Sequence, residues 1–332
     1  MTAELVAISA AIEAGESVRG TTSPNPPVGC AIVSASGALI ATGATSPAGG
    51  PHAEVNALEQ AGERARGATA VVTLEPCNHT GRTGPCSQAL VEAGIARVVY
   101  FTADPNDAAA GGAEYLRSHG VEVDFQPVRI AALQPWLRSV RHNRPSVTLK
   151  FASTLDGFTA ATDGTSKWIT GDEARELAHE DRAKLDAIIV GTGTAIADDP
   201  SLTARFPDGT LRGHQPRRVV VGTREVPEGN LTRLGFEQYA TPEEAMEVLW
   251  ATGARDVLVE GGATLAASFL ELDLVDAVQA YIAPALLGAG RGVLDRAIAG
   301  TIADARRFRT TLVRPVGGDV FIEMERDVYG TR

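Results

Sequence analysis

Two stretches of the sequence carry the residues that decide the first fold: PHAEVNAL at residues 51–58 and LEPCNHTGRTGPCSQAL at residues 74–90. They contain His52, Cys77 and Cys86, one imidazole and two thiols, which are typical protein ligands of zinc. Three protein ligands leave the fourth position of a tetrahedral ion open for water, as in catalytic zinc sites. Zinc lowers the pKa of such a water molecule to about 7. The pattern therefore predicts a zinc-dependent hydrolytic site.

Glu54 supplies the second group that a hydrolytic deamination needs. A carboxylate two residues from a ligand can take a proton from water and deliver it to the departing amine. Pro51 and Pro85 each precede a helical pattern, which places His52 and Cys86 at helix N-termini, where the dipole favours a thiolate. Residues two apart on a helix point about 200° away from each other. We therefore expect His52 at the cap of its helix, so that Glu54 can face the same metal.

The alternative interpretation is a surface histidine with core cysteines. A single cysteine is more often a core side chain than a ligand, and Cys30, inside the apolar run VGCAIV at residues 28–33, is expected to be one. For the other cysteines, H-x-E followed by two P-C pairs resembles the zinc deaminase signature. Eight residues separate Cys77 from Cys86, where nucleobase deaminases show about two. The longer spacing indicates a deaminase family other than the nucleobase deaminases, and the prediction of a zinc site is unchanged.

Helical and strand-like segments alternate through the first half of the chain. This alternation predicts a three-layer α/β domain with a mainly parallel sheet. The polar segment RHNRPSV at residues 141–147 precedes a fresh strand, VTLKFAST, so we expect two domains, residues 1–144 and residues 145–332. The stretches 43–50 and 206–216 are expected to be loops.

The composition supports two globular domains and excludes several classes of protein. The 332 residues exceed one ordinary core, and 44% hydrophobic with 21% charged residues is typical of folded domains. The net charge of -11 argues against a nucleic-acid partner. No apolar run approaches the ~20 residues that span a bilayer. The acidic, amphipathic start does not resemble a signal peptide, and three cysteines fit a reducing compartment, so we expect a cytoplasmic protein without a membrane partner.

Taken by itself, the second half gives a weaker signal. It has no G-x-G-x-x-G after a strand, so a Rossmann site is unsupported. In VLVEGGATLAASFL at residues 257–270, a buried strand runs into Gly261 and Gly262 and then a helix, whose free N–H groups can bind phosphate. A tight strand-to-helix turn explains these glycines equally well. GTGT at residues 191–194 repeats the pattern with the same ambiguity.

Several motifs together resemble one known family, the bifunctional riboflavin-biosynthesis deaminase/reductases. The resemblance implies a cytidine-deaminase-like three-layer α/β/α domain followed by a dihydrofolate-reductase-like α/β domain. It spans nearly the whole chain, and the motifs that carry it occur in the expected order. They are TSPNPPVGCAIV (22–33), HAEVNAL (52–58), LEPCNHTGRTGPC (74–86), KFASTLDGFTA (150–160), GTSKWITG (164–171), VGTGTAIADDPSLTAR (190–205) and VEGGATLAASFL (259–270).

The resemblance also implies two reactions on a phosphorylated aminopyrimidine. The first is zinc-dependent hydrolytic deamination of 2,5-diamino-6-ribosylamino-4(3H)-pyrimidinone 5′-phosphate. The second is NADPH-dependent reduction of the ribosyl to a ribityl side chain, which gives 5-amino-6-ribitylaminouracil 5′-phosphate. By similarity, Asn25 contacts the base, and His79 and Arg82 approach the substrate or its phosphate. Relatives often have a histidine shortly before the HAE motif, where this chain has Thr45. The family also implies a homo-oligomer, a dimer.

The resemblance gives further roles to residues of the second half. Lys150 interrupts an otherwise apolar strand; a lysine on an edge strand would point to solvent, whereas a buried one needs a partner such as Glu260. The resemblance favours a role for Lys150 in the site. Contacts with the substrate are implied for Ser166, Arg182, Leu202, Arg205 and Glu260. Contacts with NADPH are implied for Ala152, Trp168, Thr194, Asp198, Thr223, Gly262, Ala263, Thr264, Leu265, Ala266, Ala267 and Ser268.

The hydride step is expected to depend on positioning, because the ribosylamine must open to an imine before its C1′ accepts hydride. Asp156 and Asp198 are candidates to assist proton movement, although Asp156 in TLDG also fits a turn. Asp199, before Pro200, is expected to cap a helix or shape a turn.

Two other functions share the zinc pattern. A deaminase acting on a base in RNA is disfavoured by the acidic charge and by the long second domain. A non-catalytic metal-binding protein is disfavoured by Glu54, because a structural zinc needs no such carboxylate.

Overall fold

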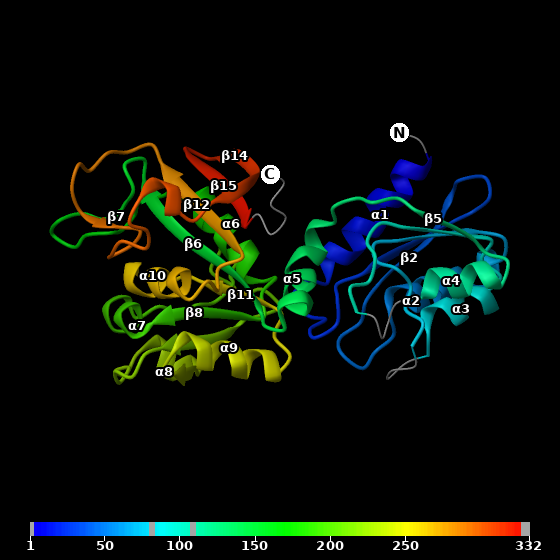
Figure 1. Cartoon of the computed structure of the whole chain (residues 1–332), viewed down its shortest axis with the longest axis horizontal. Coiled ribbons are helices and arrows are strands. Elements are labelled where there is room, and N and C mark those ends of the chain that lie inside the picture. Colours follow the sequence, from blue (N-terminus) through cyan, green and yellow to red (C-terminus); the bar gives the residue numbers. More distant parts are fainter. Residues whose placement is uncertain (1–2, 80–83, 107–110, 327–332) are drawn as a thin grey trace. The chain divides into compact units, whose positions relative to one another are not determined.

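The computed structural model describes residues 3–79, 84–106 and 111–326 (Figure 1). The chain divides into two compact units, Met1–Asn143 and Arg144–Arg332. The division falls inside the polar segment 141–147. Within the described residues, no helix has the length and apolar character needed to cross a membrane.

The first unit is built on a five-stranded sheet in the order β2-β1-β3-β4-β5. β1 runs antiparallel to both of its neighbours, whereas β3, β4 and β5 are parallel. The strands are β1 (Gly29–Val33), β2 (Leu39–Ala44), β3 (Thr69–Val72), β4 (Arg97–Tyr100) and β5 (Glu122–Phe125). The helices are α1 (Ala3–Ser17), α2 (Ala53–Ala61), η1 (Gly62–Ala65), α3 (Cys86–Glu92), α4 (Gly112–Ser118), η2 (Ala131–Leu133) and α5 (Gln134–His142).

Two glycines bring helices onto opposite faces of this sheet. A Cβ atom at Gly29 would lie 1.9 Å from the Ala11 carbonyl oxygen of α1, and one at Gly43 would lie 2.3 Å from the Ala53 carbonyl oxygen of α2. Gly43 pairs with Cys30, the neighbour of Gly29 along β1, and successive strand residues face opposite sides. The sheet is therefore covered by α1 on one face and α2 on the other, which gives the predicted three layers.

The prediction of a mainly parallel sheet is wrong, because the sheet is mixed. The turn after Val33 is too short for a crossover helix, so β1 and β2 form an antiparallel hairpin. Only β3, β4 and β5, which are linked through α3 and α4, are parallel. Residues 43–50 are also not all loop, because Gly43 and Ala44 belong to β2.

The second unit contains an eight-stranded sheet in the order β10-β9-β8-β11-β6-β12-β15-β14. Strands from β10 to β12 are parallel, and β15 and β14 are antiparallel to their neighbours. The strands are β6 (Ser146–Thr154), β8 (Ala187–Gly191), β9 (Arg217–Val221), β10 (Glu237–Tyr239), β11 (Asp256–Val259), β12 (Ala277–Ala283), β14 (Phe308–Val316) and β15 (Asp319–Arg326), with β7 (Phe158–Ala160) and β13 (Arg291–Gly292) in a small separate sheet. The helices are α6 (Asp172–Arg182), α7 (Thr192–Asp198), α8 (Asn230–Leu234), α9 (Pro242–Ala251), α10 (Ala263–Glu271) and η3 (Ile302–Asp304).

The parallel strands end at one edge of the second sheet, and this edge gathers the residues predicted for the reductase. β8 ends at Gly191 and α7 begins at once at Thr192, so GTGT spans a strand-to-helix junction. β11 ends at Val259, and α10 begins at Ala263. Ligands of parallel α/β sheets bind at this carboxyl edge.

The buried carboxylate of Asp276 anchors the first strand of the second unit. It accepts hydrogen bonds from the Arg144 guanidinium at 2.7 and 2.8 Å and from the Val147 N–H at 2.9 Å. The Asp276 side chain is 1% exposed, so solvent cannot replace these donors.

We expect Asp276→Asn to lower the midpoint of thermal unfolding by about 6 to 12 °C, because breaking a buried ion pair costs about 3 kcal/mol and each kcal/mol shifts a domain of this size by about 2–4 °C. The matched control is Asp273→Asn, which removes the pair with Arg326 where the aspartate is 51% exposed. It should shift the midpoint by no more than about 3 °C. Calorimetry measures both midpoints. Equal shifts in the two variants would show that Asp276 does not anchor the strand.

Candidate active sites

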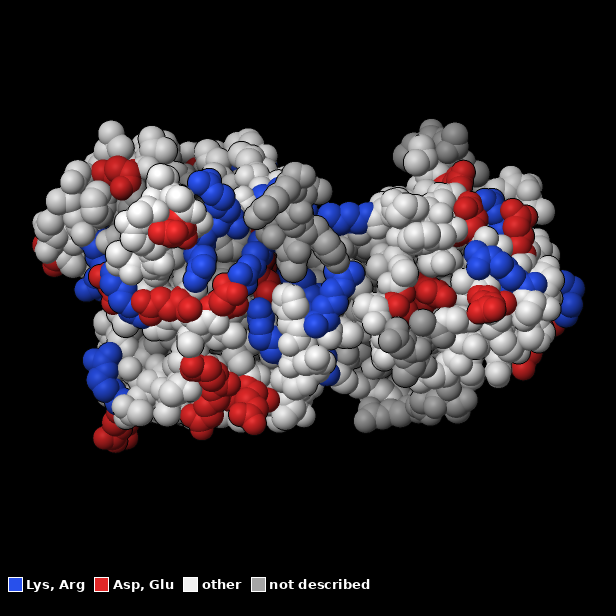
Figure 2. Space-filling model, viewed as in Figure 1, with Lys and Arg blue, Asp and Glu red and all other residues white. Residues whose placement is uncertain are grey.

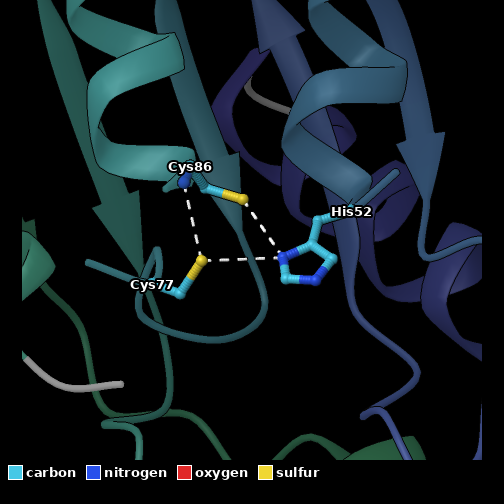
Figure 3. A group of neighbouring side chains, drawn as sticks. All are labelled: His52, Cys77 and Cys86. Carbon is cyan, nitrogen blue, oxygen red and sulfur yellow. Dashed lines mark hydrogen bonds between the residues drawn. The ribbon is translucent and has the colours of Figure 1, made fainter. Parts of the chain in front are cut away.

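Three potential metal ligands meet in the first unit, as Figure 3 shows. His52 is the N-cap of α2, Cys86 is the first residue of α3, and Cys77 lies in the loop that follows β3. His52 has extended backbone angles, φ −78° and ψ 168°, so the predicted cap position is confirmed.

The ligand atoms have the spacing of a zinc site. His52 Nδ1 lies 3.6 Å from Cys77 Sγ and 3.3 Å from Cys86 Sγ, and all three atoms lie within 4.8 Å of one another. Tetrahedral zinc, with bonds of about 2.0 Å to nitrogen and 2.3 Å to sulfur, requires nitrogen–sulfur separations of about 3.6 Å. The donors therefore fit one zinc ion, with Nδ1 as the histidine ligand.

Local hydrogen bonds favour the thiolate that a metal requires. The backbone N–H of Cys86 donates to Cys77 Sγ over 3.5 Å. The Cys86 side chain, with His52, lowers the pKa of the Cys77 thiol to about 4, against the opposing effect of burial. Cys30 is fully buried and lies outside the cluster, and burial raises the pKa of its thiol; it is a core residue, as expected.

Glu54 occupies the first turn of α2, beside the ligands. Its side chain is buried, and burial together with the nearby Cys77 raises the pKa of its carboxyl to about 7. Such a group can both accept and release a proton near neutral pH.

The other residues predicted for the first site are only partly placed. Asn25, in the loop before β1, is half-buried, and His79 is exposed. Arg82 lies outside the described residues. Thr45 is buried, and its hydroxyl accepts a hydrogen bond from the Val28 N–H at 3.1 Å, so it fastens the start of β1.

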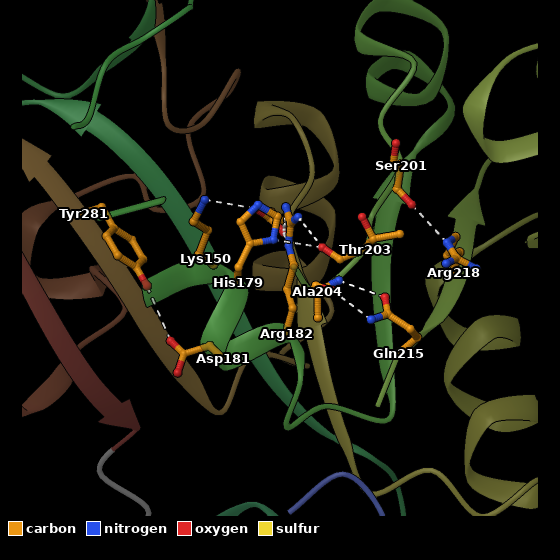
Figure 4. A network of polar contacts seen from close by, with 11 residues as sticks. Lys150, His179, Asp181, Arg182, Ser201, Thr203, Ala204, Gln215, Arg218 and Tyr281 are labelled. Carbon is orange, nitrogen blue, oxygen red and sulfur yellow. Dashed lines mark hydrogen bonds and ion pairs between the residues drawn. The ribbon is translucent and has the colours of Figure 1, made fainter. Parts of the chain in front are cut away.

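The second unit contains an almost buried charge cluster, shown in Figure 4. Lys150 on β6 donates to Glu260 Oε1 at 2.9 Å, and Arg182 at the end of α6 donates to Oε2 from two nitrogens, at 3.0 and 2.8 Å. The three side chains are only 14–17% exposed, which contradicts a solvent-facing lysine. Burial alone would raise the pKa of Glu260, but the charges of Arg182 and Lys150 lower it to about 2.

The loop 201–205 extends this cluster. The Thr203 carbonyl accepts from Arg182 Nη1 at 3.1 Å, and Arg205 Nε donates to Thr203 Oγ1 at 2.7 Å. Leu202 is buried with a φ of 49°. The predicted substrate residues Arg182, Leu202, Arg205 and Glu260 are thus brought together. Ser166 is exposed in the loop between β7 and α6, apart from these contacts.

Comparison with known proteins gives matches over both units. The C-terminal domain of RibD matches residues 145–321, and the cytidine and deoxycytidylate deaminase zinc-binding region matches residues 1–102. The riboflavin biosynthesis protein RibD of Corynebacterium ammoniagenes is 59% identical over 307 residues, which cover 90% of this chain and 91% of that protein. The chain belongs to the RibD family.

Further RibD proteins agree over the whole length. RibD of Mycobacterium tuberculosis is 46% identical, with 96% of each chain covered. The structure of Acinetobacter baumannii RibD has a TM-score of 0.82 at 38% identity, and that of a deaminase/reductase from Thermotoga maritima has 0.85 at 32%, each covering 97% of this chain and 98% of its own. The predicted combination of a deaminase-like and a reductase domain is confirmed. The chain is a bifunctional zinc deaminase and NADPH-dependent reductase of riboflavin biosynthesis.

The RibD reductase domain uses NADPH, and the carboxyl edge of the second sheet fits such a cofactor. Thr194 Oγ1 of α7 accepts from the Gly262 N–H at the N-cap of α10, at 3.0 Å. The two strand-to-helix turns therefore touch. A Cβ atom at Gly261 would lie 2.7 Å from Leu265 Cδ2, so a larger residue there would displace the Leu265 side chain. The free N–H groups at the start of α10 are suited to a phosphate.

The remaining residues predicted to contact NADPH differ in whether they can offer side-chain atoms or only backbone atoms to the cofactor. Leu265, Ala266 and Ala267 pack into the core, so they can offer only backbone atoms. Ala152 on β6 pairs with Tyr281 of β12. Trp168 is 70% exposed and lies 4.3 Å from the Arg175 guanidinium. Asp198 is the last residue of α7, and Thr223 lies in the loop after β9. Ala263 begins α10, and Ser268 lies within that helix. The Thr264 hydroxyl donates to the Asp295 carboxylate at 2.5 Å.

Sequence reasoning missed His179. Its Nδ1 lies 3.0 Å from the Thr203 carbonyl, and burial, followed by the charge of Arg182, lowers its pKa. A carbonyl only accepts, so Nδ1 carries the proton and Nε2 is an acceptor beside the cluster. His179 and Arg182 are three positions apart, so they lie on one face of α6. This spacing in the sequence could have indicated that His179 lies beside Arg182.

Two aspartates have turn-forming roles. Asp156 accepts from Thr154 Oγ1 at 2.6 Å and from the Gly288 N–H at 2.7 Å, so it joins the end of β6 to the loop after β12. Asp199 accepts from the N–H of Asn230, the first residue of α8, at 2.6 Å. The turn and cap expected for these residues are present.

Proposed function

We propose that each unit performs one of the two reactions, with residues 1–144 as the deaminase and residues 145–332 as the reductase. The substrate of the first is 2,5-diamino-6-ribosylamino-4(3H)-pyrimidinone 5′-phosphate, and the product of the second is 5-amino-6-ribitylaminouracil 5′-phosphate. The observation that carries the proposal is the zinc-spaced cluster of His52, Cys77 and Cys86 beside the buried Glu54.

In the deaminase, the protein holds the metal and moves protons. Zinc bound by the three ligands supplies a Lewis acid that makes a water molecule acidic. Glu54 takes a proton from the attacking water and gives it to the 2-amino nitrogen, so that water adds and ammonia leaves. Asn25 orients the base, and His79 and Arg82 bind the ribosyl phosphate end. Thr45 contributes by holding β1, on the evidence of its bonds to Val28.

In the reductase, the charge cluster positions the opened sugar. Arg182 and Arg205 bind the phosphate, because guanidinium groups bind phosphate with paired donors. Ser166 and Leu202 provide further contacts with the substrate. Glu260 fixes Lys150, whose ammonium lies 5.3 Å from the centre of the Tyr281 ring. Lys150 can then donate a proton as C1′ accepts hydride. The residues that would hold NADPH, the source of the hydride, are Ala152, Trp168, Thr194, Asp198, Thr223 and the 262–268 segment.

Following ammonia and product mass with and without NADPH tests the proposed function. Zinc-loaded full-length chain should release ammonia without NADPH and exchange NH for O in the substrate. Adding NADPH should add two hydrogens to that product. Removal of zinc with a chelator should stop ammonia release but leave reduction of the deaminated compound intact. NADPH consumption with no ammonia from the zinc-loaded chain would contradict the deaminase assignment.

We propose that the chain acts as a homodimer in the cytoplasm. The edge strand β14 exposes Leu312 and Val313, and an exposed edge of this length is suited to a second copy. Three free cysteines fit a reducing compartment. A monomer in sedimentation at micromolar concentration, or recovery outside the cytoplasmic fraction, would contradict these two assignments.

We expect no nucleic-acid partner. On the face shown in Figure 2, the basic side chains that gather on the second unit are bordered by acidic ones, and the net charge of the chain is -11. Measurable binding of tRNA at low salt would contradict this expectation.

A further inference from the structure

Three turns lie next to one another at the carboxyl edge of the second sheet, because β9, β8 and β11 are neighbouring strands. They follow β11 at Gly261, β8 at Gly191 and β9 at Gly222. The first two are joined through Thr194 and Gly262, as described above. At the third, a Cβ atom on Gly222 would lie only 2.8 Å from Thr192 Oγ1. The three turns therefore lie next to one another and are joined by the side chains of Thr192 and Thr194.

Arg224 lies at the far end of these three turns. Its Nε donates to Thr192 Oγ1 at 3.3 Å, and a Cβ atom on Gly193 would lie 3.1 Å from its Nη2. The guanidinium therefore lies against the first turn of α7. No carboxylate of the described residues forms an ion pair with it, so its charge is not neutralised by the protein.

The backbone that carries Arg224 is held from the neighbouring strand. Gln238 on β10 donates from its amide to the carbonyls of Gly222 and Arg224, at 2.7 and 2.9 Å. The Gly222 N–H donates to the Tyr239 carbonyl at 2.8 Å. An exposed arginine on an anchored backbone pays less entropy on binding an anion than one on a free loop.

We propose that Arg224 binds the 2′-phosphate of NADPH and determines the preference for NADPH over NADH. The inference rests on the proposed function, which places the cofactor along α10 and α7. The adenosine ribose adjoins the pyrophosphate in the cofactor, so a pyrophosphate at the Gly262 turn directs its 2′-phosphate towards the next strands, β8 and β9. An arginine beside the ribose is a known means of accepting a 2′-phosphate, and its planar donors suit a phosphate.

Binding of 2′,5′-ADP and 5′-AMP, which differ only in the 2′-phosphate, tests the proposal by calorimetry on the zinc-loaded full-length chain. Arg224→Met keeps the aliphatic stem and removes the charge. We expect it to weaken 2′,5′-ADP by about 10- to 100-fold, the range for one lost charged hydrogen-bond partner, and to change 5′-AMP by less than about twofold. Arg224→Lys, which retains a charge without the paired donors, should fall between Met and wild type.

The matched control is Arg233→Met, which removes an exposed arginine that contacts Asn230 on α8 and should leave both affinities unchanged. Equal weakening of the two probes by Arg224→Met would overturn the proposal, as would a wild-type chain that binds the probes equally or binds neither. NADPH-dependent reduction of the deaminated substrate by the same wild-type sample distinguishes these results from failure of the reductase assignment.

Discussion

Glu54→Gln lowers the rate of ammonia release by about 10²- to 10⁴-fold, the usual contribution of general acid–base catalysis, while the chain keeps its zinc. Glutamine has nearly the same shape and leaves His52, Cys77 and Cys86 untouched, but it cannot carry the proton from water to the departing amine. Ammonia release by a coupled assay and zinc content by atomic spectroscopy measure the two parts of this result.

Two controls isolate the proton shuttle. Glu59→Gln changes an exposed glutamate on the same helix and should leave ammonia release unchanged. NADPH-dependent reduction of the deaminated compound, which uses the other unit, should also be unaffected by Glu54→Gln. Full deaminase activity in Glu54→Gln would refute the assigned role, and loss of zinc in parallel with activity would make Glu54 a structural residue instead.

Glu260→Gln should reduce NADPH-dependent reduction at least about 100-fold and lower the free energy of unfolding by about 3 kcal/mol, because Lys150 and Arg182 then keep two almost buried positive charges without their counter-charge. Both cations would reorient, and the phosphate and C1′ of the substrate would lose their positioning. Stopped-flow oxidation of NADPH with the deaminated substrate and thermal unfolding measure these effects.

The matched control for Glu260 is Glu237→Gln, which removes the carboxylate of another arginine–glutamate pair, one that is more exposed to solvent. Arg217 donates to Glu237 at 2.8 and 2.6 Å, with the side chains 31% and 35% exposed. Loss of the Arg217–Glu237 ion pair should lower the free energy of unfolding by less than about 1 kcal/mol. The rate of NADPH-dependent reduction should be unchanged. Ammonia release serves as the internal control in both variants. Normal reduction by a folded Glu260→Gln chain would exclude Glu260 from the site.

The zinc site could be predicted because its chemistry is local in sequence. His52 and Glu54 are two residues apart, and both ligand cysteines follow a proline. The ligand types, the helix starts and the proton shuttle are therefore all visible within short windows of sequence. Even the cap position of His52 follows from the 3.6-residue helical period. The spacing between Cys77 and Cys86 needed the family resemblance before it indicated a substrate.

Features that depend on pairing between distant segments were less predictable. The antiparallel placement of β1 between β2 and β3 depends on which strands meet, a property that alternation alone does not contain. The strand β14 was not predicted, because its residues are mostly exposed and lack an apolar–polar alternation. His179 was missed since its partner, the Thr203 carbonyl, is a backbone group 24 residues away.

Gly43 shows how a residue without a side chain determines the dimensions of a metal centre. It allows the Ala53 carbonyl, one residue after His52 and one before Glu54, to lie directly on the sheet. A larger residue at position 43 would push the first turn of α2 away from the sheet. The distances from the His52 imidazole to the two cysteine sulfurs would then change. The spacing of the ligand atoms therefore depends on a contact between two layers of backbone that includes none of the ligand atoms.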